Sequence, residues 1–355
     1  MTSINNGNQL KTTNGQDEDF SHIMQFTTAS VLPMAMRAVI EMDLLEIIAK
    51  AGPNAQLSPS QIASHLQTKN PDAPVMLDRI LRLIASYSLI TCSSVSHENG
   101  PVERFYGLAP ISKYFVKDEE EVSVSPMILM VLDKVCMESW FHLKDAILDG
   151  GVPFKKAHGV DSWKYTGIDQ KFNQVFNKAM FNNTSLIMKK ILEKYNGFEN
   201  VKGVVDVGGG IGTAVSIITS KYPAIKGINF DLPHVVQHAP SYPGVEHVGG
   251  DIFVSIPKGE AIFMKGIFHD WSDEHCKKIL KNCSEALPEH GKVIVVERIL
   301  PVVLETNTAA KDIFQFDLIM MTQHGVGKER LEKEFKAIAK ESGFTCNIVC
   351  RLFNY

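Results

Sequence analysis

The 355-residue sequence lacks the features that mark several large classes of protein. No apolar run reaches the roughly 20 residues that span a bilayer, and the polar segment 1–19, expected to be a disordered tail, lacks the apolar core of a secretory signal. The six cysteines form no CxxC pair and no zinc-like set, which favours free, buried thiols in a cytoplasmic protein. A formal net charge of -4 without a basic cluster argues against nucleic acid or an anionic membrane as a partner.

Two phosphate-binding motifs are also missing, although a glycine-dense turn follows the apolar run 204–207. Gly208, Gly210 and Gly212 give G-x-G-x-G, whereas the dinucleotide pattern requires G-x-G-x-x-G, and no G-x-x-x-x-G-K-[ST] loop follows. The next apolar run ends at Asp231, where an acid can hold ribose hydroxyls. The turn and the acid therefore predict a nucleoside cofactor without phosphates, of which S-adenosylmethionine is the common one.

The pattern of the chain changes near residue 200. After that point, short β-rich runs at 204–207, 225–230, 245–248, 261–264, 292–296 and 347–353 alternate with helical stretches. Such alternation is typical of a parallel sheet with right-handed crossovers. We therefore expect an α/β fold in residues 191–355, a Rossmann-like, doubly wound sheet.

The preceding region, residues 20–190, is mainly helical in pattern. Ser58 is a predicted helix N-cap, with Pro59 at the first helical position and Gln61 closing a capping box. A helix–turn–helix pattern followed by two short strands is winged-helix-like. Winged helices often bind DNA, but the second helix here has no basic stripe, so we expect it to serve packing. The unusually apolar stretch 20–50 also suggests burial against a partner subunit.

Three residues form a candidate acid–base group. His269 follows the fourth strand, Glu297 ends the fifth, and Glu329 comes after the loop 322–327 at the start of a predicted helix. A carboxylate can fix the tautomer of an imidazole and stabilise the charge that develops on it during base catalysis. The sequence alone does not bring the three together, and a lone histidine is more often structural.

From about residue 20 onward, the chain resembles the plant caffeic-acid-type O-methyltransferases. The resemblance implies a homodimer, S-adenosylmethionine as methyl donor with S-adenosylhomocysteine as product, no metal, and His269 as general base between Glu297 and Glu329. It also implies that the N-terminal region is a dimerisation unit that helps to close the partner's site. The segments that carry the resemblance are 32–34, 73–79, 138–140, 206–212, 230–234, 249–251, 269–274 and 327–330.

The same resemblance assigns the cofactor site and the substrate site. The expected cofactor-binding residues are Gly208, Asp231, Leu232, Asp251, Ile252 and Lys265. The expected substrate-binding residues, several of which ordinary core packing would equally explain, are Met130, Val131, Phe172, Phe176, Met180, Asn183, Gly266, Phe268, Asp270, Ile319, Met320 and His324.

Several of these positions depart from the pattern of the family. The lignin-pathway members usually have Asn at position 131, His at 183, Trp at 266, Cys at 268 and Asn-Pro-Gly at 324–326. Loss of Trp at 266 empties a large volume that Phe268 refills only in part, which favours a wide, flat phenol such as a hydroxylated furanocoumarin (bergaptol, for example). A phenylpropanoid of the caffeic or 5-hydroxyferulic type, a flavonoid or an alkaloid phenol is the alternative.

Rival functions of other classes remain. A metal-dependent mechanism could use Asp270 and Asp273, but Asp273 suits the first turn of a helix beside the N-cap Ser272. A nicotinamide dehydrogenase is a second rival, but this sequence lacks the third glycine of the dinucleotide-binding pattern. A catalytically inactive dimeric binding protein would have no need of His269 and the two glutamates.

Overall fold

The computed structural model describes residues 15–96 and 102–345, and the chain divides into two compact units, Met1–Val116 and Lys117–Tyr355. The sequence placed the boundary between residues 190 and 191, a position that lies inside the helix α11 (Gln170–Lys194). The difference has a packing cause: α11 contacts both α6 (Ser125–Val131) and α12 (Thr213–Lys221), and so joins the segment after residue 116 to the sheet unit.

The first unit is a helical domain with a small antiparallel sheet. The strand β3 pairs with β1 on one side and β2 on the other. Of the expected tail, residues 1–14 lie outside the described residues, whereas 15–19 begin the first helix. The elements are α1 (Gly15–Thr27), α2 (Val31–Glu41), α3 (Leu44–Lys50), β1 (Gln56–Leu57), α4 (Pro59–Ser64), α5 (Ala73–Ser86), β2 (Ile90–Val95), β3 (Glu103–Leu108) and the 3-10 helix η1 (Pro110–Tyr114).

Local signals in this unit match the structure. The predicted capping box is present, since Gln61 N donates to Ser58 Oγ and Ser58 N donates to Gln61 Oε1. Cys92 is exposed, so the expectation that the cysteines are buried is wrong at this position. Within the described residues, no single helix is long and apolar enough to cross a bilayer; Glu18–Thr27 and Val31–Glu41 meet that test only as a pair bent by 53°.

The second unit contains the predicted parallel sheet; the expected run 347–353 lies outside the described residues. Its strands are β4 (Gly203–Val207), β5 (Lys226–Asp231), β6 (Val245–Gly249), β7 (Ala261–Lys265) and β8 (Lys292–Val296), in the order β6-β5-β4-β7-β8. All four neighbouring pairs are parallel. The strand order reverses between β4 and β7, which is where ligands bind in folds of this kind. The fold class predicted from the sequence is therefore confirmed.

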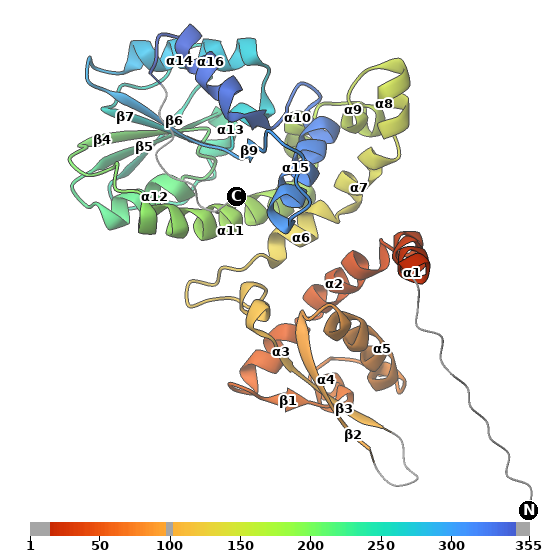
Figure 1. The fold of residues 1–355 in the computed structure, drawn as a ribbon. Helices are drawn as coiled ribbons and strands as arrows, with labels where there is room; N and C mark the ends of the chain where they lie inside the picture. Colours follow the sequence, from red (N-terminus) through yellow and green to blue (C-terminus); the bar gives the residue numbers. More distant parts are fainter. Residues whose placement is uncertain (1–14, 97–101, 346–355) are drawn as a thin grey trace, which may run out of the picture. The chain divides into compact units, whose positions relative to one another are not determined.

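Helices cover both faces of this sheet (Figure 1). Val205 and Ile262 pack on the side of α14 (Asp273–Ala286) and α16 (Glu332–Glu341), whereas their neighbours Val204 and Phe263 pack on the side of α11 and α12. The alternation follows from the two-residue period of a strand. Because both faces are covered, the central strands β4 and β7 are mostly buried and apolar, whereas the edge strand β6 carries the exposed Glu246.

The remaining elements bring the functional segments to the sheet. The helix α15 (Thr308–His324) includes part of the expected loop 322–327, and the helix expected to start at Glu329 begins at Glu332 instead. These elements are α7 (Lys134–Trp140), α8 (Leu143–Asp149), α9 (Pro153–His158), α10 (Ser162–Ile168), α13 (Pro233–Val236), the 3-10 helix η2 (Phe268–Asp270), β9 (Ile299–Leu300), α15 (Thr308–His324) and β10 (Arg330–Leu331).

Candidate functional site

The glycine turn at the end of β4 is fixed by the backbone and by Asp231. Gly208 N donates to the carbonyl of Phe230 at 2.8 Å, and Gly210 N donates to Asp231 Oδ2 at 2.8 Å. The other oxygen of Asp231 accepts from Leu232 N at 2.7 Å. Burial raises the pKa of Asp231, and these two backbone hydrogen bonds oppose the rise.

Asn229 and His247 form a second support that the sequence analysis missed. Asn229 Nδ2 donates to the carbonyl of Gly210 at 2.9 Å and lies 3.0 Å from His247 Nδ1. His247 Nε2 lies 2.9 Å from the carbonyl of Pro240, so this nitrogen carries the proton and Nδ1 accepts from Asn229. The available signal was an asparagine between Ile228 and Phe230 in an apolar run, and the structure shows that Asn229 is fully buried.

The turn has room for a ligand beside its acid. Gly210 has a φ of 59°, and a Cβ built on it would meet nothing within 4 Å. Its amide points to Asp231, whose carboxylate oxygens keep lone pairs beyond those used by the two amides. An open backbone next to a carboxylate suits a ribose diol, and the glycine turn offers no cationic side chain of its own for a phosphate.

The other expected cofactor residues follow neighbouring strands. Asp251 follows β6 and accepts from Phe253 N at 2.8 Å, while Ile252 packs against the sheet core. Leu232 is partly exposed after β5, and Lys265 ends β7. Burial lowers the pKa of Lys265, and the charges of Asp206 and Glu297 act against that shift. The carboxyl ends of β5, β6 and β7 therefore bring these residues to the same edge of the sheet.

The three residues of the acid–base group do meet in space. His269 Nδ1 lies 3.0 Å from Glu329 Oε1 and 3.7 Å from Glu297 Oε2. A carboxylate only accepts, so the close contact with Glu329 places the proton on Nδ1 and leaves Nε2 free to take another. Nε2 faces Asp270 Oδ1 at 3.6 Å, beyond the length of a good hydrogen bond.

The charge around His269 is strongly negative. Burial alone would lower the pKa of His269, but the charge of Glu297, the hydrogen bond with Glu329 and the charge of Asp270 raise it to about 9. Burial raises the pKa of Asp270 to about 7, and it also raises that of Glu297. The pKa of the imidazole is raised because the carboxyl groups of Glu297, Glu329 and Asp270 surround it.

Glu297 also shapes the turn that carries His269. Its Oε1 accepts hydrogen bonds from Ile267 N at 2.8 Å and Phe268 N at 2.7 Å. Its Oε2 has no hydrogen-bond partner among the described residues, although it is buried. One ligand atom from each of His269, Glu297 and Glu329 lies within 4.8 Å of the others, a spacing that also suits a metal ion.

Five of the expected substrate residues form one apolar cluster on α6 and α11. They are Met130, Val131, Phe172, Phe176 and Met180. All lie on α6 or on the long helix α11, which contact each other.

Trp163, which the sequence analysis missed, links this cluster to His324. Its ring contacts Phe176 edge-on at 6.1 Å and stacks on His324 at 4.8 Å with an interplanar angle of 20°. His324 Nδ1 lies 3.2 Å from Ser162 Oγ, and its Nε2 lies 3.5 Å from Asp270 Oδ1. Burial and the charge of His269 lower the pKa of His324 to about 3, so His324 is neutral.

The remaining substrate candidates differ in position. Gly266, with a φ of 65°, lies beside the base: a Cβ built on it would stand 3.3 Å from His269 Nε2. Phe268 is buried in the sheet core with Cys276, so the expectation that it refills the space left at position 266 is not supported. Asn183 is half-buried on α11, whereas Ile319 and Met320 lie on α15, which contacts η2.

Comparisons with known proteins match both parts of the chain. The O-methyltransferase domain matches residues 140–345, and the O-methyltransferase dimerisation domain matches residues 24–118. Caffeic acid 3-O-methyltransferase 1 of Populus tremuloides is 60% identical over 349 residues, covering 98% of this chain and 95% of its own length. The caffeic acid 3-O-methyltransferase of Medicago sativa is 58% identical over 348 residues, covering 98% and 95%.

A solved structure shares the fold at low identity. It is that of human N-acetylserotonin methyltransferase in complex with SAM, with a TM-score of 0.77 and 18% identity. The match covers 94% of each chain.

Proposed function

The chain belongs to the plant caffeic acid O-methyltransferase family and is an S-adenosylmethionine-dependent O-methyltransferase of plant phenolics; from that premise we propose that its acceptor is a fused-ring phenol of the hydroxycoumarin class. We further propose that His269 acts as the general base. The observation that carries the base assignment is the 3.0 Å contact between His269 Nδ1 and Glu329, which leaves Nε2 free.

The acid–base step follows from this geometry. A phenol has a pKa of about 10, so little phenolate exists at neutral pH. His269 Nε2 takes the hydroxyl proton while the phenolic oxygen uses an electron pair to form the new O–C bond to the methyl group. The S–C bond of the donor would break with its electron pair left on sulfur, so the leaving group would be neutral S-adenosylhomocysteine. Glu329 holds the proton on Nδ1, and its charge together with that of Glu297 stabilises the imidazolium that results.

The cofactor is proposed to lie against the glycine turn. Asp231 would hold the ribose hydroxyls, while Gly210 leaves the backbone open to a close approach. Bound there, S-adenosylmethionine supplies the methyl group on a positively charged sulfur. The positive charge on sulfur and the negative charge that develops on the phenolic oxygen neutralise each other during transfer. A site without water therefore need not oppose the reaction.

The acceptor class rests on the space next to the base. A side chain at position 266 would begin 3.3 Å from His269 Nε2, where the acceptor hydroxyl must lie. Glycine there leaves room for a second fused ring. Val131, in the apolar cluster on α6 and α11, adds an apolar wall, and His324 is a neutral polar group beside Asp270 that a ring substituent can contact.

A panel of acceptors tests the proposal. We expect a hydroxylated furanocoumarin such as bergaptol to give a higher kcat/KM than caffeic or 5-hydroxyferulic acid, with the methylated position read by mass spectrometry and NMR. A higher value for either acid than for every fused-ring phenol would show that the chain retains the specificity printed in the names of its relatives.

The variant Gly266→Trp sharpens the test. We expect it to lower kcat/KM for the fused-ring phenol about 10-fold relative to caffeic acid, since the indole fills the space of the second ring. The ratio of two substrates cancels any loss of folded enzyme. An unchanged ratio would mean that position 266 does not set the width of the acceptor.

We also propose that the enzyme is a homodimer formed through its first unit. The matched dimerisation domain supports this, and α1 and α2 expose large apolar side chains that water disfavours. These are Phe20, Ile23, Met24, Phe26, Val31 and Met34. Sedimentation at micromolar concentration measures the mass directly, and a monomer there would refute the proposal.

A further inference from the structure

The short turn η2 carries His269 and is held at both of its ends. At its start, Glu297 accepts from the amides of Ile267 and Phe268. On the carbonyl side, Phe268, the first residue of the turn, and Trp271, which follows its last residue, accept from Arg330. A turn of three residues has few hydrogen bonds of its own, so its orientation depends on such outside partners.

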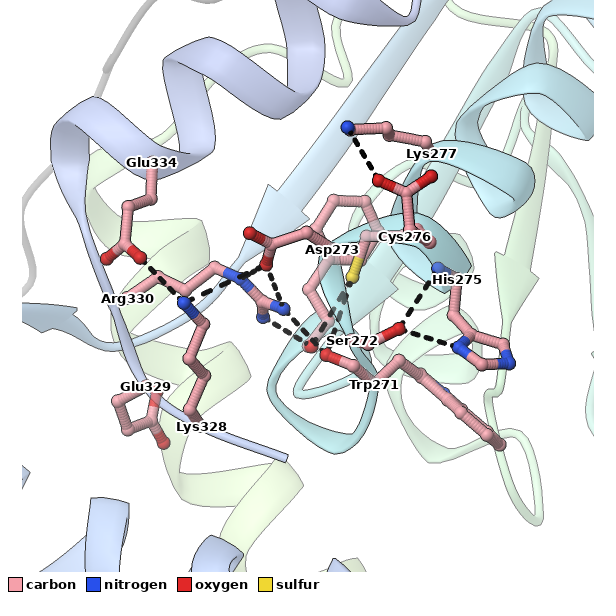
Figure 2. A network of polar contacts seen from close by, with 12 residues as sticks. Trp271, Ser272, Asp273, His275, Cys276, Lys277, Lys328, Glu329, Arg330 and Glu334 are labelled. Atoms are coloured by element: carbon pink, nitrogen blue, oxygen red, sulfur yellow. Dashed lines mark hydrogen bonds and ion pairs between the residues drawn. The ribbon is translucent and has the colours of Figure 1, made fainter. Parts of the chain in front are cut away.

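Arg330 satisfies those carbonyls with a guanidinium that is fully buried (Figure 2). Nη1 donates to the carbonyl of Phe268 at 2.7 Å, and Nη2 donates to that of Trp271 at 2.6 Å. Nε and Nη2 both bind Asp273 Oδ1, at 2.9 and 2.8 Å, on the first turn of α14. A buried guanidinium is costly unless it is paired, and here it bonds both to Asp273 and to two carbonyls.

The same segment supplies the carboxylate that contacts the imidazole. Glu329 directly precedes Arg330, and its Oε1 lies 3.0 Å from His269 Nδ1. Gly327 passes so close that a Cβ there would stand 2.6 Å from the carbonyl of His269. Glu329 N is held in turn by Asp317 Oδ1 at 2.8 Å. Residues 327–330 therefore contact the η2 turn through backbone, carboxylate and guanidinium at once.

We propose that Arg330 is a positioning residue for the general base: by tying the segment of Glu329 to the carbonyls of the η2 turn, it sets the contact between Glu329 and His269. This inference rests on the proposed role of His269. The planar fork of arginine suits this task because it reaches two carbonyls and a carboxylate in fixed directions, whereas the single ammonium of lysine cannot.

The variant Arg330→Lys tests the fork while keeping the charge. We expect kcat per folded enzyme to fall about 10- to 100-fold, as small misplacements of a catalytic group do, with the KM of the phenol and the Kd of S-adenosylmethionine within about twofold. The midpoint of the NMR titration of His269 in the free enzyme should move to lower pH, because a larger distance between Glu329 and His269 stabilises the imidazolium less.

Two further variants keep the test decisive. Asp273→Asn leaves the guanidinium and its carbonyl bonds in place but removes the ion pair, so it should fold and show the same changes to a smaller extent. Lys277→Met is the matched control, because Lys277 is a partly exposed cation on the same helix as Asp273 and pairs with Glu274 and Glu341, away from Arg330. It should leave both kcat and the titration of His269 unchanged.

The outcomes separate the inference from the proposed function. A native titration and native kcat in both Arg330→Lys and Asp273→Asn, with only a lower melting temperature, would reduce Arg330 to a structural role. A variant His269→Asn that retained turnover would refute the base assignment. In that case the titration of His269 in Arg330→Lys would still report whether Arg330 sets the contact with Glu329.

Discussion

The two sides of the proposed site are held together by different kinds of contact. On the cofactor side, Asp231 accepts from the backbone amides of Gly210 and Leu232, the first 21 positions away in sequence and the second its neighbour. On the acceptor side, His269 meets Glu329 across 60 positions, and His324 meets Ser162 across 162. The contacts of Asp231 lie within one strand–turn–helix–strand unit, whereas those of His269 and His324 join side chains from separate segments.

This difference predicts how each side responds to substitution. Backbone contacts survive most changes of side chain, so the cofactor side should lose only the interaction that is removed. The acceptor side depends on charges that shift one another's pKa, so a single change there should alter several properties at once. The predictions below test that contrast, and the largest effect comes first.

Replacement of the base should separate chemistry from cofactor binding. In His269→Asn, kcat should fall by about 100- to 10,000-fold, the usual contribution of a positioned base. The Kd of S-adenosylmethionine, measured by calorimetry, should change less than about twofold because the cofactor side is held by other segments. A kcat within about threefold of the wild type would contradict the assignment.

Replacement of Asp231, the proposed ribose-binding residue, should weaken cofactor binding and leave the chemical step nearly unchanged. In Asp231→Asn, the Kd of S-adenosylmethionine should rise about 10-fold, since a charge-assisted hydrogen bond is replaced by a neutral one. At saturating cofactor, kcat should stay within about threefold. Glu246→Gln, an exposed acid on the neighbouring strand β6, is the control and should change neither value. A large loss of kcat with unchanged affinity would place Asp231 in the chemical step.

Activity should rise with pH further than an ordinary histidine would allow. The neutral imidazole is the active form, and the surrounding carboxylates raise the pKa of His269 to about 9, so kcat/KM should increase through the range from pH 7 to pH 9. Glu329→Gln removes one negative charge, lowers that pKa and moves the acid limb to lower pH. The plateau should fall several-fold, while the loss at pH 6 should be smaller.

An acid limb that stays in place in Glu329→Gln would show that the carboxylate does not govern the titration of His269. An acid limb of the wild-type pH profile centred near pH 6.5 would show that the surrounding carboxylates do not raise the pKa of His269. The enzyme saturated with cofactor should have its limb at lower pH than the free enzyme, since a sulfonium charge disfavours the imidazolium.

The parts that the sequence predicted well are the local ones. The five strands follow from apolar runs and turns, and Ser58 and Ser272 cap the helices that their spacing indicates. Asp273 then falls in the first turn of α14, as expected. The glycine turn and Asp231 belong to the same class, because both are fixed by neighbouring strands and by the carboxyl edge of a parallel sheet.

The parts that it missed depend on tertiary packing. The helix α15 carries apolar residues on several faces, since it packs against α7, α9 and η2, so its period is weak in the sequence. No local sequence pattern predicts that Trp163 stacks on His324 or that Arg330 donates to the carbonyls of the η2 turn. Likewise, Phe268 turned inward to the core although its neighbour His269 faces the site.

The smallest expected effect concerns a metal ion. The donor atoms of His269, Glu297 and Glu329 are close enough to share one, so the acceptor side offers two alternative uses of the same atoms. A metal bound at Nδ1 would leave the imidazole proton on Nε2, the nitrogen that has to accept the proton of the phenol. Base catalysis and metal binding therefore exclude each other at this histidine. Treatment with a chelator should change kcat less than about twofold, and added Zn²⁺ should inhibit. Loss of activity on chelation, with recovery on addition of one equivalent of metal, would overturn the base mechanism and with it the contrast between the two sides.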